Sequence, residues 1–491
     1  MQAERARKGT RLRLEFSALL LTLFLVSLFA TAANAAPRPG SLDPGFGIGG
    51  RALVSVGTQN QPSGSLEAQS WLSGTVATAT MSGGGLVAAG ERTLVAFRRD
   101  GTVDRAFGSN GRVNLPVVGE GETFVKDVAV DPEGRIVVLA AARFARGGGL
   151  AIVARLSACG RFDASFADNG ILLTDFGLPA PQPWGPSAPH EAPTDVLPVG
   201  LAIDDQGRAV IGGTTVAGFA ACRGSGEQPR HAVFLARLLP SGNLEPDFGK
   251  GGVVLDEWSP FNLEQHPFFR GIDVREGAIV YATASGSDCE GSDSGLLVRL
   301  DEAGARDPGF GSAGLADVSS VEALPLGIAI DRRGRIVVMR QATHEETGYL
   351  ASFEVVSRWN ADGTLDAGFG RGGEIAVKLP GEASGFEALA ADARGRTLLA
   401  GQVEPPLTRS QKKRHVFPPP RFALMRLSAT GLPDHGFGRK GMVTTGFGRR
   451  SRAVATDVAI RGGKATLAGP LLSDRIHLRH GFAVARYLLD R

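Results

Sequence analysis

One short phrase, Gly-x-x-acid-x-x-Phe-small-x-x-Gly, occurs seven times in this sequence and sets narrow limits on the fold. Each copy keeps the same spacing between its first glycine, its acidic residue, its phenylalanine and its last glycine. The copies span residues 40–50, 101–111, 160–170, 242–252, 304–314, 363–373 and 431–441. Their phenylalanines are Phe46, Phe107, Phe166, Phe248, Phe310, Phe369 and Phe437. A catalytic loop needs one unique set of residues, so a phrase that recurs this often indicates a structural role.

The spacing between copies predicts the size of the repeating unit. Copies recur about every 60 to 80 residues, which is enough chain for about four short strands, the size of a propeller blade. After Phe107, strand-like stretches at 111–116, 124–130, 135–139 and 150–156 are separated by turn residues. Each unit is therefore predicted to be a four-stranded antiparallel sheet.

A second motif marks a tight hairpin inside each unit. It has the form Ala-x-Asp-x-x-Gly-Arg at residues 129–135, 202–208, 329–335 and 390–396, with looser versions at 81–85, 273–277 and 460–463. The aspartate opens the turn through its side chain, and the glycine supplies a positive φ. The seven hairpins match the seven phrases.

The two ends of the repeat array are out of phase. The phrase at Phe46 has no strand before it, and the strand at 482–487 has no phrase after it. The N-terminal strand near 51–56 would therefore complete the blade that begins at about Ala453, closing a ring without exposed sheet edges. We predict an all-β fold, a seven-bladed β-propeller of four-stranded blades over residues 36–491.

The phrase and its hairpin resemble the delta-60 repeat family, a secreted bacterial β-propeller family. The resemblance covers about residues 40–491, and its departures are Ala167 for glycine, Glu245 for aspartate, and Arg306 and Pro433 where Leu or Val is usual. It implies the propeller fold and a secreted protein. The activity of the family is unassigned, so the resemblance implies no mechanism.

The N-terminus predicts a secretory signal peptide over residues 1–35. A basic stretch precedes the apolar run 16–30, and Ala33-Asn34-Ala35 places small residues at the cleavage positions. An uncleaved membrane anchor is the alternative, and no span is expected after cleavage. Cleavage removes five of the 53 Lys and Arg residues and two of the 50 Asp and Glu residues, which leaves 48 of each. We therefore expect a neutral protein of the cell envelope or extracellular space, without a nucleic-acid partner.

Loop lengths indicate which face carries the function. With the strands of a blade labelled A to D from the centre outward, A–B and C–D turns are short and share one face. Length variation lies in B–C and D–A loops on the other face, where binding usually resides. We predict a non-enzymatic, monomeric scaffold that binds a protein or glycan there. The alternative is an extracellular polysaccharide hydrolase or lyase with carboxylates in the same loops.

Candidate residues follow from that face. Aromatic and histidine side chains in D–A loops are the binding candidates, although they could equally pack the loops onto the blades. They are Trp71, Trp184, Trp258, Phe261 and His266.

Cysteines and acidic residues add two further expectations. Cys222 and Cys289 lie in B–C loops of adjacent blades and are a disulfide candidate, which leaves Cys159 as a free thiol. The acidic run Asp288 to Asp293 is an imperfect calcium loop, and a solvated loop is the better interpretation. No catalytic residue, metal or cofactor is predicted.

The signal peptide can be tested directly. N-terminal sequencing of the protein recovered from outside a producing cell is expected to start at Ala36. A protein that retains residues 1–35 in the membrane fraction would support the anchor instead.

Overall fold

The computed structural model describes most of the chain after residue 36. The described ranges are 37–58, 76–119, 122–144, 148–179, 194–222, 226–256, 266–286, 294–318, 323–346, 349–379, 384–407, 409, 411, 418–448, 451–473 and 479–490. The predicted signal peptide therefore lies outside the described residues.

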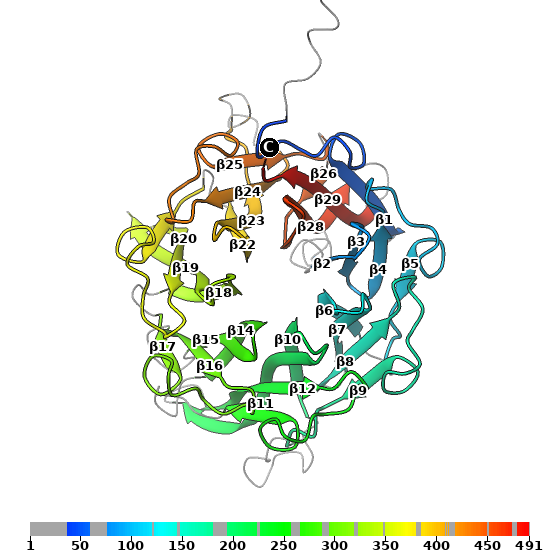
Figure 1. Cartoon of the computed structure of the whole chain (residues 1–491), viewed down its shortest axis with the longest axis vertical. Helices are drawn as coiled ribbons and strands as arrows, with labels where there is room; N and C mark the ends of the chain where they lie inside the picture. Colours follow the sequence, from blue (N-terminus) through cyan, green and yellow to red (C-terminus); the bar gives the residue numbers. More distant parts are fainter. Residues whose placement is uncertain are drawn as a thin grey trace, which may run out of the picture.

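Seven antiparallel sheets surround a common centre, as Figure 1 shows, and the predicted seven-bladed propeller is confirmed. Blade 1 contains β2 (Val76–Thr80), β3 (Leu86–Gly90), β4 (Thr93–Phe97) and β5 (Arg112–Asn114). Blade 2 contains β6 (Glu122–Val130), β7 (Ile136–Arg143), β8 (Gly149–Leu156) and β9 (Ile171–Thr174). Blade 3 contains β10 (Val196–Ile203), β11 (Ala209–Cys222), β12 (Gly226–Leu238) and β13 (Val253–Asp256).

The next three blades repeat this order. Blade 4 contains β14 (His266–Arg275), β15 (Ala278–Gly286), β16 (Ser294–Leu300) and β17 (Leu315–Asp317). Blade 5 contains β18 (Ala323–Ile330), β19 (Ile336–Glu346), β20 (Tyr349–Trp359) and β21 (Glu374–Val377). Blade 6 contains β22 (Gly385–Ala391), β23 (Thr397–Val403), β24 (Arg421–Leu427) and β25 (Met442–Thr445).

Blade 7 joins the two ends of the chain, as predicted. It contains β27 (Asp457–Arg461), β28 (Lys464–Ser473), β29 (Arg479–Leu488) and, as its outer strand, β1 (Arg51–Thr58). The pairing of β1 with β29 sets Arg51 opposite Ala485. A short strand, β26 (Ser451–Ala453), also pairs with β28. The ring is thus closed by backbone hydrogen bonds between segments from opposite ends of the sequence (Figure 1).

The repeated phrase links each blade to the next through the backbone. The residue after the phenylalanine donates its N–H to the carbonyl that precedes the next phrase. The glycine opening that next phrase has a positive φ and lies against the donating residue; at Gly363, with φ 81°, a Cβ would be 2.5 Å from Gly311 N. The seven bonds, 2.6–3.2 Å long, are Gly47 to Asp100, Gly108 to Cys159, Ala167 to Ser241, Gly249 to Ala303, Gly311 to Asp362, Gly370 to Thr430 and Gly438 to Pro39.

Arginines from the third strand hold the phrases in place. In blade 5, the Arg358 guanidinium lies 4.6 Å from the centre of the Phe369 ring and pairs with Asp366 at 2.7 Å. It also donates to the carbonyl of Ala429 in the next blade, at 2.6 Å. Six arginines cover the buried phenylalanine of their blade in this way: Arg155, Arg237, Arg299, Arg358, Arg426 and Arg486. All seven phrase phenylalanines are buried.

The core lies between neighbouring blades. Between blades 3 and 4, for example, Val210, Leu235 and Phe248 pack with Phe269 and Tyr281. Alternate residues of each inner strand therefore face opposite neighbours, as expected when both faces of a sheet are covered.

Three aspartates of the innermost strands fasten pairs of blades. Asp127 accepts a hydrogen bond from Leu201 N of blade 3 at 2.9 Å, and Asp273 accepts one from Ile330 N of blade 5 at 2.7 Å. Asp457 accepts one from Thr78 N at 2.6 Å, which joins blade 7 to blade 1. Burial raises the pKa of Asp127 to about 7 and those of Asp273 and Asp457 to about 6, and the charge of Asp457 adds to the shift of Asp127.

Two further observations bear on the sequence predictions. The B–C loop that was expected around Cys222, at residues 216–231, is instead part of an extended hairpin, because β11 and β12 stay paired up to Cys222 and Gly226. Within the described ranges, no helix is long and apolar enough to span a membrane.

The role of the phrase glycine can be tested with Gly363→Ala. This variant adds both a strained positive φ and a clash with Gly311, so the free energy of unfolding should fall by about 2–4 kcal/mol in chemical denaturation. Gly372→Ala is the matched control, because φ is 67° there and nothing lies within 4 Å of a Cβ. The control should cost only about 1–2 kcal/mol. Equal losses would contradict the packing role.

The raised carboxyl pKa values predict a pH dependence of stability. The folded state binds protons that the unfolded state has released, so these groups stabilise fully below about pH 4 and lose their contribution as the pH rises through about 7. The free energy of unfolding should therefore fall between about pH 5 and about pH 8.

Denaturation of Asp127→Asn at both pH values tests the assignment. The variant keeps one acceptor oxygen in place of two, so it cannot accept from both Leu201 N and Val128 N and should be less stable at low pH, but its slope with pH should be shallower than that of the wild type. Asp205→Asn, at an exposed turn position, is the control and should keep the wild-type slope. An unchanged slope in Asp127→Asn would rule out this residue as the source.

Candidate functional site: an arginine-rich pocket on the turn face

The A–B turns of four blades neutralise their own arginine. In blade 5, Asp331 accepts hydrogen bonds from Arg335 N at 3.0 Å and from Arg335 Nε at 2.8 Å. The same aspartate–arginine closure occurs in blades 2, 3 and 6, between residues 131 and 135, 204 and 208, and 392 and 396. The Asp-x-x-Gly-Arg motif therefore contributes no free positive charge to the turn face.

Three blades depart from this pattern: blade 1 has Met81 and Gly85 in place of the aspartate and the arginine, and blades 4 and 7 have an arginine in place of the aspartate. In blades 4 and 7 the turn is shorter, and Arg275 and Arg461 take the position of the turn-opening aspartate. Glu276 and Gly277 have φ values of 51° and 80°, and Gly462 and Gly463 have 55° and 70°. Two successive residues of positive φ form the tight two-residue turn typical of hairpins. Each of these arginines therefore lacks the carboxylate that the longer turn would provide.

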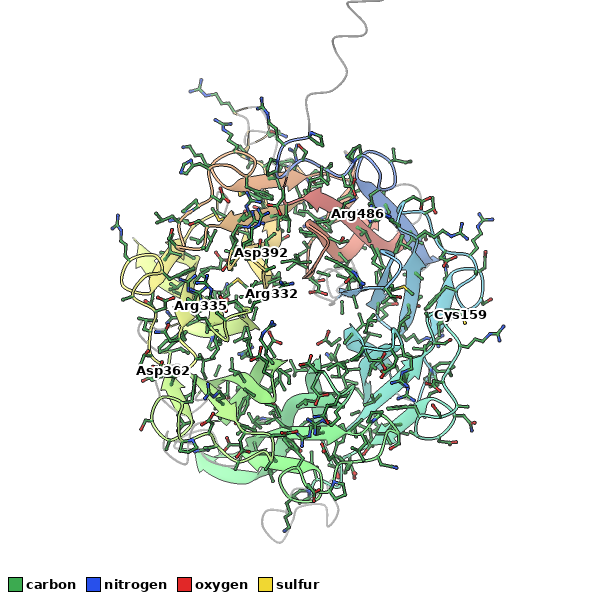
Figure 2. All side chains as sticks on the ribbon, in the orientation of Figure 1. Cys159, Arg332, Arg335, Asp362, Asp392 and Arg486 are labelled. Carbon is green, nitrogen blue, oxygen red and sulfur yellow. The ribbon has the colours of Figure 1, made fainter. Side chains whose placement is uncertain are left out.

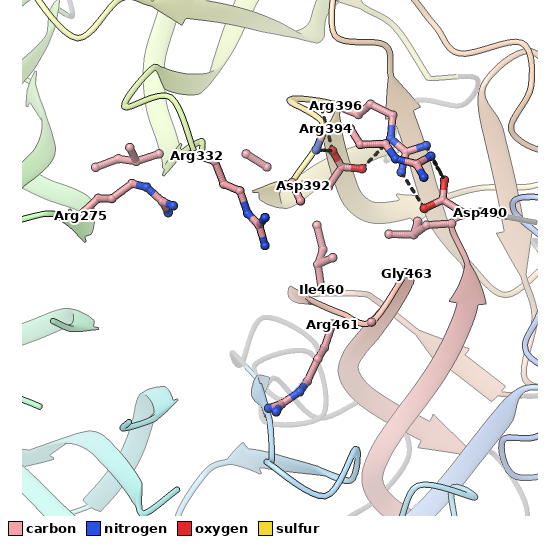
Figure 3. A pocket seen from close by; sticks show the side chains of 14 residues that line it. Arg275, Arg332, Asp392, Arg394, Arg396, Ile460, Arg461, Gly463 and Asp490 are labelled. Atoms are coloured by element: carbon pink, nitrogen blue, oxygen red, sulfur yellow. Dashed lines mark hydrogen bonds and ion pairs between the residues drawn. The ribbon is translucent and has the colours of Figure 1, made fainter. Parts of the chain in front are cut away.

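These turns border a pocket of about 460 Å³ (Figure 3). Its walls come from the A–B turns of blades 4 to 7 and from the end of the chain after β29. Five arginines line it: Arg275, Arg332, Arg394, Arg396 and Arg461. Figure 2 places Arg332 beside the centre of the ring, whereas Cys159 lies at the outer rim.

Two of the five arginines are bound by the carboxylates of the pocket. Arg394 and Arg396 contact Asp490 Oδ1 at 2.7 and 2.9 Å, and Arg396 Nε contacts Asp392 at 2.5 Å (Figure 3). Burial raises the pKa of Asp490, but the hydrogen bond and charge of Arg396 outweigh it and hold the pKa below its usual value. Asp490 is therefore ionised at neutral pH.

The other three arginines leave an excess of positive charge. Among the described residues, Arg275, Arg332 and Arg461 form no ion pair, and Arg275 Nε is buried without a hydrogen-bond partner. Arg461 donates only long bonds, of 3.4 Å, to the carbonyls of Thr80 and Ser82. In Figure 3 the three side chains extend toward the central opening. Guanidinium groups in such a cluster suit carboxylate, sulfate or phosphate ligands.

The structure does not describe the side chains of the predicted binding residues. Trp71, Trp184, Trp258, Phe261 and Cys289 lie outside the described residues, as does the acidic run at 288–293. His266 and Cys222 lie at the ends of β14 and β11, and only their backbone is described. Cys159 is an exposed free thiol. The binding and disulfide predictions therefore stay predictions.

One signal in the sequence could have located the arginines. The hairpins at 273–277 and 460–463 carry arginine where the four regular turns carry aspartate. A search for copies of the motif finds them only as its looser versions. No group of three or more His, Cys, Asp and Glu side chains that could hold a metal ion occurs within the described ranges.

Comparison with known proteins provides structural neighbours only. Neither a scan of protein-family models nor a search of curated proteins finds a match. The resemblance to the delta-60 repeat family therefore stays a prediction.

Among solved structures, the chain is similar to the polysaccharide lyase Uly1, with 11% identity and a TM-score of 0.48 over 84% of this chain and 90% of that one. An ulvan lyase of family PL25, bound to -[GlcA(1-4)Rha3S]-, matches with 9% identity and a TM-score of 0.45 over 92% and 96%. A Trypanosoma rangeli sialidase in complex with sialic acid matches with 10% identity and a TM-score of 0.38 over 91% and 59%. At these identities the likeness concerns the fold alone.

These neighbours correct the predicted function. The expected non-enzymatic scaffold is corrected: the neighbours are, by name, polysaccharide lyases and sialidases, and the polysaccharide hydrolase or lyase alternative fits them better. Binding through the B–C and D–A loops stays a prediction, because the candidate side chains there lie outside the described part of the chain. The arginine-rich pocket opens at the A–B turns, on the face expected to be only structural. A short turn can become positively charged when arginine stands in place of aspartate, without any increase in the length of the turn.

Proposed function

We propose that the protein is an extracellular enzyme that processes an anionic polysaccharide, holding the negative groups of the sugar in the arginine-rich pocket. One observation carries the proposal: Arg275, Arg332 and Arg461 line one pocket and form no ion pair among the described residues, although the charge of Arg275 also acts on the buried Asp273. The predicted signal peptide at residues 1–35 supports the extracellular location, since such polymers lie outside the cell.

The charge of the pocket selects among glycans. Like charges held together repel each other, and an anionic ligand relieves that repulsion while filling the hydrogen-bond capacity of the guanidinium groups. A neutral sugar cannot do either. Uronic-acid or sulfated polysaccharides are therefore the substrate class that this pocket favours.

The state of the pocket carboxylates favours elimination over hydrolysis. Hydrolysis by paired carboxylates needs one of them protonated as the acid. Here Asp490 has a lowered pKa and Asp392 is bound to Arg396. In elimination, a base such as the ionised carboxylate of Asp490 takes the proton beside the sugar carboxylate, and the bond to the glycosidic oxygen breaks. A double bond forms, and the released oxygen takes up a proton. Arginines around the carboxylate stabilise the negative charge that builds up.

A matched pair of substrates tests the proposal. The purified protein is incubated with a uronic-acid polysaccharide and with the same polymer after reduction of its carboxyl groups to alcohols. New reducing ends report any cleavage, and ultraviolet absorbance of the unsaturated product reports elimination. We expect both signals with the acidic polymer and neither with the reduced one.

Variants connect this activity to the pocket. Arg332→Ala removes a charged contact and should lower kcat/KM by about 10- to 100-fold. Arg105→Ala, at an exposed position on a C–D turn, is the control and should leave the activity unchanged. Equal cleavage of the neutral polymer, or full activity of Arg332→Ala, would contradict the proposal.

A further inference from the structure

Two smaller pockets adjoin the arginine-rich pocket on the same face. One, of about 340 Å³, lies between blades 4 and 5 and shares Arg275 and Arg332 with it. The other, of about 270 Å³, lies between blades 7 and 1 and shares Arg461. Arginine side chains therefore lie between the central pocket and each of its neighbours and line both pockets.

Each flanking pocket adds one further arginine that forms no ion pair among the described residues; Arg299 also lines the pocket between blades 4 and 5, but it is paired with Asp307. Arg333 lines the pocket between blades 4 and 5, and Arg99 lines the one between blades 7 and 1. Both side chains are exposed, and among the described residues neither forms an ion pair. Lys464 and Arg486 also line the latter pocket, but both are bound to Asp43, at 2.7 and 2.8 Å. The unpaired charge thus extends beyond the central pocket in both directions.

The remaining part of the ring carries the opposite charge at the same turn positions. Where blade 5 has Arg332 and Arg333, blade 2 has Pro132 and Glu133, and blade 3 has Asp205 and Gln206. The arginines therefore follow an arc over blades 4, 5, 6, 7 and 1 and end at blades 2 and 3; within this arc, the blade 4 turn also carries the exposed Glu276. Positive charge that is confined to one arc indicates an extended binding site for a linear ligand. It does not indicate a symmetric binding site around the whole central opening.

We infer that the three pockets form one groove that binds an extended run of an anionic polysaccharide, with charged sugars placed against Arg333 and Arg332 at one end and against Arg461 and Arg99 at the other. This inference rests on the proposed function and adds the length of chain that the protein recognises. Single-stranded nucleic acid is the other linear polyanion, but binding it usually requires aromatic platforms. Among the residues that the structure describes, no aromatic side chain lines any of the three pockets.

A size-graded series of oligosaccharides from one uronic-acid polymer tests the groove. Affinity is measured by calorimetry for the wild type, Arg99→Ala, Arg333→Ala and Arg105→Ala, with an oligodeoxythymidine as a separate ligand. We expect wild-type affinity to rise with length until the groove is filled. Arg99→Ala and Arg333→Ala should each weaken the longest members by about two- to fivefold, and more than the shortest ones. Arg105→Ala should match the wild type at every length.

The outcomes separate this inference from the proposed function. Affinity that is independent of length, while Arg332→Ala still lowers binding and cleavage, would overturn the groove and leave the central pocket standing. Binding of the carboxyl-reduced series as tightly as the acidic series would overturn both. Tighter binding of the oligodeoxythymidine than of the longest oligosaccharide would assign the groove to nucleic acid and overturn the inference.

Discussion

The whole ring depends on one backbone hydrogen bond that occurs seven times. The N–H after each phrase phenylalanine reaches the carbonyl before the next phrase, and the last of these bonds runs from Gly438 to Pro39. The bond can form only where the next phrase opens with a residue lacking a Cβ, as the approach of Gly363 to Gly311 shows. The phenylalanine fills the space beneath it, and the third-strand arginine covers the ring and reaches the neighbouring blade. A closed ring of such contacts does not depend on the A–B turns, although some of them add contacts between blades, as Arg394 and Arg396 do with Asp490.

That separation explains how a structural face can carry a charged site. The C–D turns contain the phrase and cannot vary without loss of the ring contacts. The A–B turns on the same face need only a residue that can open a tight turn, and a two-residue turn meets this need without aspartate. Replacing aspartate with Arg275 in blade 4 and Arg461 in blade 7 removes a negative charge and adds a positive one at each place. The blade framework is unaffected, while the electrostatic character of the turn face changes.

Regular features were predictable from the sequence, and irregular ones were not. The invariant spacing of the phrase predicted the number of blades, and its phase at the chain ends predicted the pairing of β1 with β29, because both follow from repetition. The continued pairing of β11 and β12 was missed, since residues 216–231 lack the alternation typical of a strand. The pocket was missed because it depends on which turns lie next to each other around the ring. Arg275 and Arg461 are far apart in the sequence and line the same pocket because the blades are arranged in a ring.

The central claim is that the turn face binds an anionic sugar through its unpaired arginines. A crystal structure of the protein with an oligosaccharide from a uronic-acid polymer tests this most directly. The account predicts a sugar carboxylate within hydrogen-bond distance of at least two of the guanidinium groups of Arg275, Arg332 and Arg461. An oligosaccharide bound among the B–C and D–A loops, with the arginine-rich pocket empty, would contradict it.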